Sequence, residues 1–597
     1  MMSEITILTS RKLDTVDKNL IKLIDFLGLK SNDLKLSGSD ASITNLSKQI
    51  SKDTSCLMIN YSFLTDIIPN IELADMFRRF LFSKIPFAMV YNVYPDDLLN
   101  SAIEHLSYGA FRSVNYHEVS QNNYQITDDF RDICKQFSGL SFETKNNNID
   151  FALNIGKQNI DIFNLITINK LPFFVKFKIE NCNLFILANK KILDIDDKIT
   201  EPWSIKEYFS QFIPLMMFIK YVFGDRCWHS RQAYASFIID DPLLRMNYGF
   251  LNYKRLLELM DQNNFHTTLA FIPWNYKRSK KEVARIFKKR KDRFTLCVHG
   301  CYHTDNEFGI NDSNKLNKKV KTAIKKMKRH EELSGVPFDN VIVFPQGKFS
   351  SESMRILKCN NYLSAVNTTL ADVNAPDELK ISDLLDMAIM KYSCFPLFAR
   401  KYPGEVIDFA FDLFLGKPIF IVEHHDYFRN GYEEILEFAR SINRLDEEIQ
   451  WDGLRNIIKR SYLEKISFDG TNNIKIYANE CEIKNTSETY NKYFIKKKEC
   501  SEIPVSSVTM NGKHTSYILE NQCLKLTIEV PPKTTANLKI LYEDIYPYIT
   551  GKETLKEQTE VWIRRHLSEL RDNYISKSEL LLSISKKAIQ LKRSILD

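Results

Sequence analysis

Residues 230–450 repeat one pattern, in which a short apolar segment of β type precedes a segment with the periodicity of an amphipathic helix. The segments expected to be strands are 234–239, 268–272, 295–298, 341–344, 363–366 and 419–422. The segments expected to be helices are 253–262, 280–290, 315–333 and 351–359. Strands joined by helices form parallel sheets whose faces the helices cover. The pattern therefore predicts an α/β fold, with a distorted (β/α) barrel over 230–450.

The rest of the chain differs in character from this stretch. At 597 residues it exceeds what one core accommodates, since a domain averages roughly 150 residues. Residues 1–200 alternate strand-like and helical segments and predict a separate α/β parallel-sheet domain, joined by a helical connector over 201–229. Short strands with polar turns over 460–545 predict a small β-sandwich. Residues 552–597 predict a charged helical tail that packs or oligomerises through its apolar positions, with contact of its basic end with a membrane as the alternative. These positions are Leu580, Leu581, Ile584, Ile589 and Leu591.

Composition limits the cellular compartments in which the protein is expected and the partners that it is expected to bind. The eleven cysteines are scattered and form no CxxC pair, which is typical of a reducing compartment. The N-terminus has no secretory pattern, and the apolar stretch 212–223 is too short to span a bilayer, so we expect a cytoplasmic protein. The basic segments 277–293 and 318–329 indicate solvated helix faces or an anionic glycan or lipid-linked substrate near a membrane surface, and no nucleic-acid motif is present.

Two adjacent carboxylates, Asp240 and Asp241, follow the first strand of the expected barrel. Successive strand side chains point to opposite faces, so one of the two residues must leave the regular strand for both carboxylates to reach one pocket. A turn before Pro242 is the structural alternative, because Asp-Pro favours turns.

Two histidines, His299 and His303, end the third strand of the expected barrel. Histidines four apart share one face of a helical turn, and neutral imidazole is a common zinc ligand. Cys297, His299, Cys301 and His303 also alternate, which permits a structural zinc site on one strand face. We disfavour that site because ligands two apart on a rigid strand cannot close a tetrahedron, and Gly300 indicates that the strand breaks.

Together the two motifs predict a catalytic metal centre. One carboxylate and two imidazoles form a facial ligand set with open positions for water and substrate, and a second carboxylate beside them can accept a proton. The order Asp240-Asp241, then His299 and His303, resembles the NodB-homology polysaccharide deacetylases of carbohydrate esterase family four. The resemblance implies that Asp240 is the general base and that Asp241, His299 and His303 bind a divalent metal, most simply Zn²⁺.

Later motifs resemble the family more loosely. Residues 344–347 (FPQG) match a turn whose backbone holds the oxyanion, with Phe344 in place of the family's arginine and Gln346 in place of its aromatic residue. The resemblance implies roles in oxyanion or substrate binding for Pro345, Gln346, Gly347 and Lys348, and we consider Lys348 as the replacement positive charge. The family's late histidine, the general acid, corresponds to His424, with His425 as the alternative. Asn367 stands where the family has an aspartate that pairs with this acid.

The resemblance implies a metal-dependent hydrolase that removes acetyl groups from an N-acetylated glycan in surface-polysaccharide biosynthesis. Residues 1–200 resemble a flavodoxin- or amidotransferase-like domain, but no glycine-flanked nucleophile is present, so glutaminase activity is not expected. Trp274 and Tyr302 are candidates for stacking on sugar rings or for ordinary rim packing. A glycan-binding or assembly protein without turnover and an amidase acting on a non-sugar substrate are the alternatives.

Overall fold

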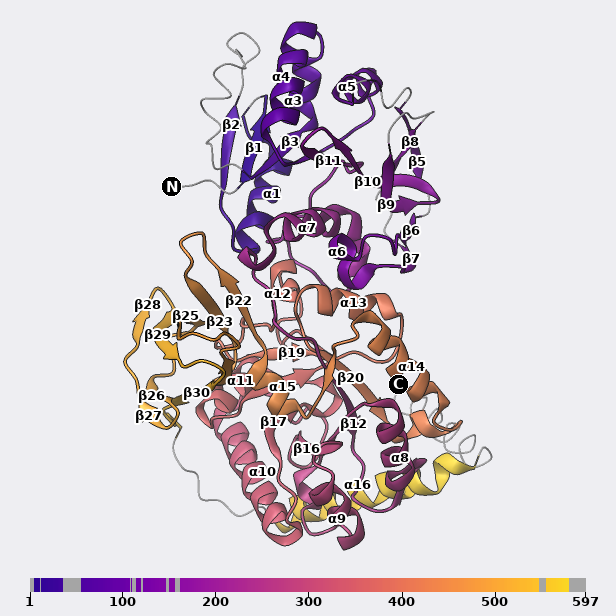
Figure 1. Ribbon diagram of the computed structural model, residues 1–597. Coiled ribbons are helices and arrows are strands. Elements are labelled where there is room, and N and C mark those ends of the chain that lie inside the picture. The colour runs from indigo at the N-terminus through magenta and orange to yellow at the C-terminus, as the bar shows by residue number, and fades with distance from the viewer. Residues whose placement is uncertain are drawn as a thin grey trace. The chain divides into compact units, whose positions relative to one another are not determined.

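The computed structural model describes residues 5–10, 12–35, 55–107, 109, 114–119, 122–145, 150–155, 161–546 and 554–578 (Figure 1). The chain divides into two compact units by its contacts. The first unit comprises Met1–His229 with two short later segments, Lys380–Ser382 and Lys465–Gly470. The second unit comprises the remaining residues and contains every metal, base and acid candidate named above.

The first unit is built on a nine-stranded sheet. Its strand order is β2-β1-β3-β4-β11-β10-β9-β6-β7. The bounds are β1 Ile5–Thr9, β2 Ser31–Lys35, β3 Cys56–Asn60, β4 Phe87–Tyr91, β6 Asn122–Ile126, β7 Ser141–Thr144, β9 Ile162–Ile168, β10 Leu171–Ile179 and β11 Cys182–Leu187. The pairs from β2 to β11 are parallel, and the others are antiparallel.

Helices of the first unit follow from local sequence signals. Helix α1 (Thr15–Phe26) begins with a capping box in which the side chains of Asp14 and Asp17 each accept a backbone N–H. The other long helices of this unit are α4 (Ile71–Lys84) and α7 (Phe209–Phe223). Helix α7 is apolar and buried over most of its length, so this part of the expected connector belongs to the core of the first unit.

The second unit contains a nearly closed barrel of parallel strands. Its order is β19-β18-β17-β16-β15-β12-β20, with β21 (Gln450–Trp451) beside β12. The bounds are β12 Tyr234–Asp240, β15 Thr267–Phe271, β16 Phe294–His299, β17 Asp339–Val343, β18 Ser364–Asn367, β19 Leu397–Ala399 and β20 Ile419–His424. A single β-bridge between Lys401 and Ile421 joins the end of β19 to β20. The predicted distorted (β/α) barrel is confirmed, and β19 is the strand that the sequence pattern missed.

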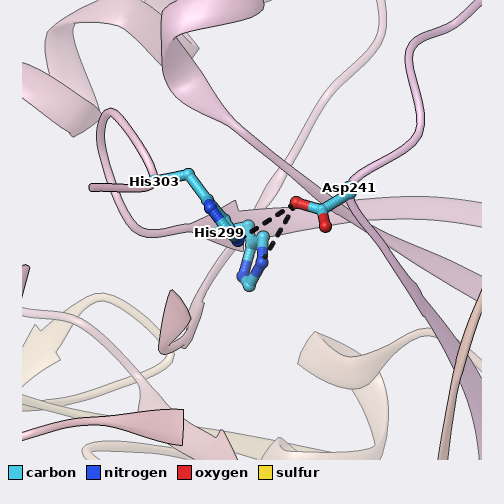
Figure 2. Close-up of side chains that lie close together, drawn as sticks. All are labelled: Asp241, His299 and His303. Atoms are coloured by element: carbon cyan, nitrogen blue, oxygen red, sulfur yellow. Dashed lines mark ion pairs between the residues drawn. The ribbon is translucent and has the colours of Figure 1, made fainter. Parts of the chain in front are cut away.

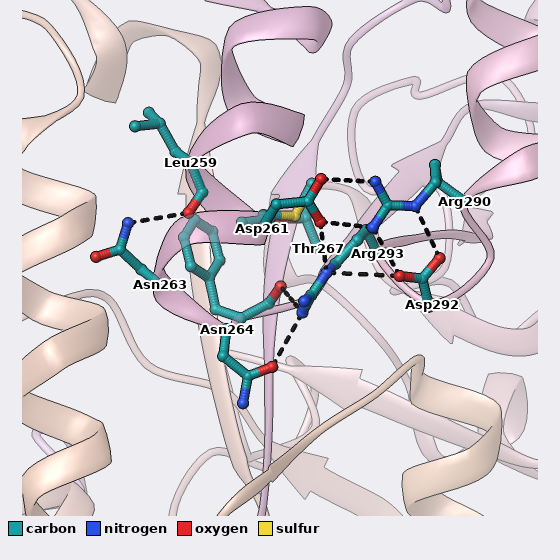
Figure 3. A network of polar contacts seen from close by, with 10 residues as sticks. Leu259, Asp261, Asn263, Asn264, Thr267, Arg290, Asp292 and Arg293 are labelled. Carbon is teal, nitrogen blue, oxygen red and sulfur yellow. Dashed lines mark hydrogen bonds and ion pairs between the residues drawn. The ribbon is translucent and has the colours of Figure 1, made fainter.

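Helices cover the outside of this barrel. They are α8 Tyr253–Asn263, α9 Lys281–Lys289, α10 Ser313–Ser334, α11 Ser351–Cys359, α13 Val406–Phe414 and α14 Glu433–Leu445. At the start of β15, Arg290 donates to Asp261 and Asp292, and Arg293 donates to Asp261 (Figure 3). This network ties α8 to the connection between α9 and β16 at the N-terminal ends of the strands, the end opposite His299 and Asp240.

Two smaller sheets follow the barrel and enclose their own apolar core. One sheet has the order β22-β23-β25-β29-β28 and the other β24-β30-β26-β27. The bounds are β22 Tyr462–Ile466, β23 Asn472–Ile476, β24 Glu480–Lys484, β25 Asn491–Lys498, β26 Val505–Met510, β27 Lys513–His514, β28 Ile518–Glu520, β29 Cys523–Val530 and β30 Thr535–Tyr542. Alternating burial along β25 and β29 is the signature of strands with one face on the core. The predicted β-sandwich is present.

The last described α-helix is α16 (Leu555–Asn573), which begins with a capping box between Thr554 and Glu557 and is followed by a short 3-10 helix, Ile575–Lys577. The apolar tail positions named above, from Leu580 to Leu591, lie outside the described residues. Over the part of the chain that the structure describes, no helix combines the length and apolar character needed to cross a membrane.

Candidate metal centre and catalytic site

The adjacent carboxylates separate at the end of β12. Asp240 is the last residue of the regular strand, and Asp241 follows it with a left-handed backbone torsion, φ 81°. A non-glycine residue in this region carries strain of about 1–3 kcal/mol. The turn frees Asp241 from the strand's alternation, so both side chains reach the same end of the barrel, as the sequence argument required.

The two histidines are brought together by a loop, and the expected helical turn is wrong. His299 ends β16, and Gly300 and His303 both have left-handed backbones, with φ 60° and 59°. The carboxylate of Glu307 accepts the backbone N–H groups of residues 301, 302 and 303. These three bonds replace the hydrogen bonds of a helix, because the N–H groups point inward at one buried carboxylate.

Asp241, His299 and His303 form one cluster (Figure 2). Nε2 of His299 lies 3.5 Å from Oδ1 of Asp241, and Nε2 of His303 lies 3.3 Å from the same oxygen. One ligand atom from each residue lies within 4.8 Å of the other two. Burial alone would raise the pKa of Asp241, but His303, His299 and the nearby Arg565 together lower it. The cluster thus keeps an ionised carboxylate between two imidazoles.

The donor set fits a divalent cation. Tetrahedral ligands ~2.1 Å from a zinc ion are about 3.4 Å apart, which matches both oxygen–nitrogen separations. Nδ1 of His299 lies 3.0 Å from the carbonyl oxygen of Val343, so Nδ1 carries the proton and Nε2 presents its lone pair to the cluster. Oδ1 of Asp241 is buried and has no hydrogen-bond partner among the described residues. An orphaned carboxylate oxygen facing two imidazole lone pairs is what a metal site requires.

Asp240 is held by an arginine that the sequence analysis missed. Nη1 and Nη2 of Arg400, the residue after β19, donate to the Asp240 carboxylate at 2.7 and 2.8 Å, and both side chains are buried. Burial alone would raise the pKa of Asp240, but Arg400, His299 and His424 outweigh it and hold this pKa well below its usual value. A carboxylate in this setting stays ionised at neutral pH.

The late histidines face different surroundings. His424 is paired in register with Asp240 between β20 and β12, and its ring stacks on Tyr402 with centroids 6.4 Å apart. The ring of His425 packs against Tyr248, and its Nε2 lies 3.5 Å from Oδ1 of Asp572 on α16. His424 is therefore the histidine beside Asp240, and His425 lies among the residues that contact α16.

The turn Pro345–Gly347 lies close to the histidine loop. A side chain on Gly300 would collide with Pro345, which shows how closely the turn packs on the loop. The amides of Gly347 and Lys348 donate to carbonyls within the turn. The side chain of Lys348 pairs with the exposed Asp305, whereas Arg400 provides the positive charge at Asp240. Asn367 donates to the carbonyl of Gly347, so it supports this turn.

The two aromatic residues predicted to stack on sugar are engaged within the protein. The ring of Tyr302 has the ammonium of Lys326 4.2 Å from its centroid. The ring of Trp274 meets His566 of α16 edge-on at 6.0 Å, and the guanidinium of Arg278 lies 5.3 Å from its centroid. Both rings therefore have cationic or aromatic neighbours on at least one side.

The fold of this chain is similar to those of several solved protein structures. No family model and no curated protein sequence matches the chain. The solved structure of Agd3, described as a novel carbohydrate deacetylase, is similar over 91% of this chain and 99% of its own, with a TM-score of 0.48 and 9% identity. A putative polysaccharide deacetylase from Mycobacterium smegmatis is similar over 38% of this chain and 89% of its own, with a TM-score of 0.27 and 14% identity.

A third likeness is a family 4 carbohydrate esterase pseudoenzyme from Bacillus anthracis, which covers 38% of this chain and 66% of its own, with a TM-score of 0.24 and 11% identity. The first two structures are described as deacetylases of carbohydrate or polysaccharide, and the third as a pseudoenzyme of the family that the sequence motifs resemble.

Proposed function

We propose that the chain is a metal-dependent hydrolase that removes acetyl groups from an N-acetylated polysaccharide or glycan precursor. The observation that carries the proposal is the convergence of Asp241, His299 and His303 beside an ionised, buried Asp240. A divalent cation held by the three ligands, Zn²⁺ by its preference for this donor set, would activate water and polarise the acetyl carbonyl.

The residues of this chain divide the proton transfers between them. Asp240 accepts the proton from the attacking water, and Arg400 keeps it ionised and oriented for that step. His424, across the β12–β20 pair from Asp240, donates a proton to the leaving nitrogen. In the turn Pro345–Gly347, Gly347 and Lys348 use their amides internally, so we assign the oxyanion to the amide of Gln346.

The alternative is a glycan-binding protein without turnover, and the departures at Phe344, Gln346 and Asn367 favour it. Two of these departures have a counterpart among the contacts of other residues. Arg400 supplies the positive charge that Phe344 cannot, and Asn367 has a structural partner in Gly347.

Acetate release from N-acetylated oligosaccharides, measured with the full chain after loading with Zn²⁺ or another divalent metal, tests the proposal. We expect turnover in the wild type that His303→Ala reduces by at least ~10³-fold, because a ligand to the activating metal is lost. A matched control is His514→Ala, which removes an exposed histidine of the sandwich. Glycan binding without acetate release under every divalent metal would establish the binding protein instead.

A further inference from the structure

Helix α16 packs on the barrel with the opposite polarity to an ordinary amphipathic helix. Its buried side chains are charged and spaced four and three residues apart, Arg565, Glu569 and Asp572. Its large apolar side chains are exposed, among them Leu555, Trp562, Ile563, Leu567 and Leu570. Hydrophobic burial normally orients a helix the other way, so polar contacts with the barrel fix its orientation.

Polar contacts hold α16 against loops that follow three barrel strands. Asp572 accepts from the hydroxyl of Tyr248 at 2.8 Å, and Asn573 accepts the backbone N–H of Gly249 at 2.9 Å, both in the segment after β12. Glu569 binds Arg278, after β15, through both carboxylate oxygens. Asp572 also faces His425, directly after β20. These loops lie at the C-terminal ends of the strands, where the metal and base candidates are.

Of the three buried charged residues on α16, Glu569 and Asp572 have polar partners, and Arg565 has none among the described residues. Arg565 is 2% exposed, its Nε has no hydrogen-bond partner among the described residues, and no ion pair in that part of the chain includes it. Its positive charge lies within electrostatic range of Asp241, His303 and Tyr248. Burying an unpaired guanidinium costs several kcal/mol, so its retention requires a partner.

Asp241 cannot be a full partner once the proposed metal is bound. A divalent cation takes the negative charge of Asp241, while the charges of Asp240 and Arg400 cancel each other. The loaded site then carries an excess of positive charge with Arg565 at its edge. An anionic group of the substrate would satisfy that charge, and a guanidinium binds carboxylate and phosphate through two parallel hydrogen bonds.

We propose that Arg565 recognises an oxyanion, a carboxylate or a phosphate, that the substrate carries on the same sugar as its acetylated nitrogen. The inference rests on the proposed function and names the class of its substrate, an acidic N-acetylated sugar. Helix α16 thereby supplies a specificity-determining residue to a site whose other residues come from the barrel.

Three matched sugars test the proposal: N-acetylglucosamine, its 6-phosphate and N-acetylglucosaminuronic acid. Calorimetric titration of the metal-loaded chain carrying His424→Gln, which lacks the proposed proton donor, measures binding, and acetate release from the metal-loaded wild type measures selectivity. We expect at least one acidic sugar to bind about ten-fold more tightly than the neutral one. The 6-phosphate and the uronic acid separate phosphate from carboxylate as the preferred group.

Variants assign the preference to one side chain. Arg565→Gln should abolish the difference between acidic and neutral sugars, and Arg565→Lys should keep part of it because charge remains without the planar fork. Arg564→Gln is the matched control, since this neighbouring arginine is not among the buried residues of the helix and should retain the full preference.

Equal affinity for all three sugars, no measurable binding of the acidic sugars, or a preference that survives Arg565→Gln would overturn the proposal. The proposed deacetylation and the proposed anion site can be disproved independently of each other. Acetate release without charge preference leaves the proposed function and removes this inference. Arg565-dependent binding of acidic sugars without acetate release under any metal removes the proposed deacetylation and leaves the anion site.

Discussion

Asp240 and Asp241 are neighbours in the chain, yet their carboxylates face different partners. Asp240 stays in the strand and meets Arg400, while the left-handed backbone of Asp241 turns its side chain towards His299 and His303. Substituting a residue with a branched β-carbon at 241 would add strain at this torsion. The division between the proposed base, Asp240, and the proposed ligand, Asp241, therefore depends on a single backbone conformation.

The ion pair between Arg400 and Asp240 should contribute strongly to stability as well as to chemistry. Removing one partner of a buried pair leaves an uncompensated charge and costs about 3–5 kcal/mol. We expect Arg400→Met to lower the free energy of unfolding by that amount and to abolish acetate release. Urea unfolding followed by circular dichroism measures the first effect.

The double variant Asp240→Asn with Arg400→Met is the matched comparison. It removes both charges, so it should recover most of the lost stability and none of the activity. Unchanged stability in Arg400→Met alone would contradict the assignment of a buried, mutually compensating pair.

Sequence reasoning predicted the three candidate metal ligands that the structure brings together, and it missed Arg400 for a physical reason. The motifs at 240–241 and 299–303 are local, and their residue types specify their chemistry. Arg400 follows a strand of three residues, Leu397–Ala399, which is too short to produce a recognisable period. Its partner lies 160 residues away in the sequence, so only the closed barrel brings the two together.

At the scale of elements, the loop after β16 depends on Glu307. This side chain is 1% exposed and accepts three backbone N–H groups, which fix the position of His303. We expect Glu307→Gln to weaken divalent-metal affinity by about 10–100-fold, as loss of a residue supporting a ligand typically does. The amide can accept through one oxygen only, and its NH₂ opposes the N–H groups.

Competition with a metal-sensitive chelating dye measures this affinity. Asp305→Asn is the control in the same loop, because Asp305 is exposed and pairs with Lys348 at the surface. An affinity in Glu307→Gln equal to that of Asp305→Asn would show that the loop holds His303 without the carboxylate.

The spacing of His299 and His303 predicted that the two side chains lie together, but a loop brings them together and the expected helical turn is wrong. Gly300 permits a left-handed backbone, and a side chain there would collide with Pro345 and Glu307. The role of Glu307 had one local signal, an acidic residue four positions after His303 in a segment of turn-forming residues. That signal does not say that the carboxylate points inward.

At the scale of the whole molecule, buried histidines should make the barrel sensitive to acid. His266 is fully buried, and burial, with Arg293 nearby, lowers its pKa from 6.5 to about 3. Because the folded pKa lies below the unfolded one, the stabilising effect is complete above pH 6.5 and is lost as the pH falls towards 3. Each pH unit in this window removes about 1.4 kcal/mol.

Between pH 7.5 and pH 5.0 we expect His266 to account for a loss of about 2 kcal/mol in the free energy of unfolding. Urea unfolding at the two pH values measures the loss in the wild type and in His266→Gln, where this part of it should disappear. His514→Gln, at an exposed position, should behave as the wild type. An equal acid sensitivity in His266→Gln would show that other groups cause it.

Features of the fold that depend on neighbouring residues could be predicted from the sequence, and features that depend on residues far apart in the chain could not. The strands β12, β15, β16, β17, β18 and β20 were found because each is a continuous apolar run with its own local signal. The closure of the barrel and the packing of α16 depend on contacts between residues more than 100 positions apart. The charged inner face of α16 also reverses the pattern from which helix orientation is usually inferred.

The barrel has a seam where the chain closes between the end of β19 and β20. One bridge, Lys401 with Ile421, and the hydrogen bonds of Lys401 to Phe420 and Val422 join the two edges. The Arg400–Asp240 pair crosses the same seam. A brief local opening at the seam would separate Asp240, the proposed base, from Arg400, while the sandwich and the first unit stay folded. Activity would thus be lost through local opening of this seam under conditions milder than those that unfold the whole molecule.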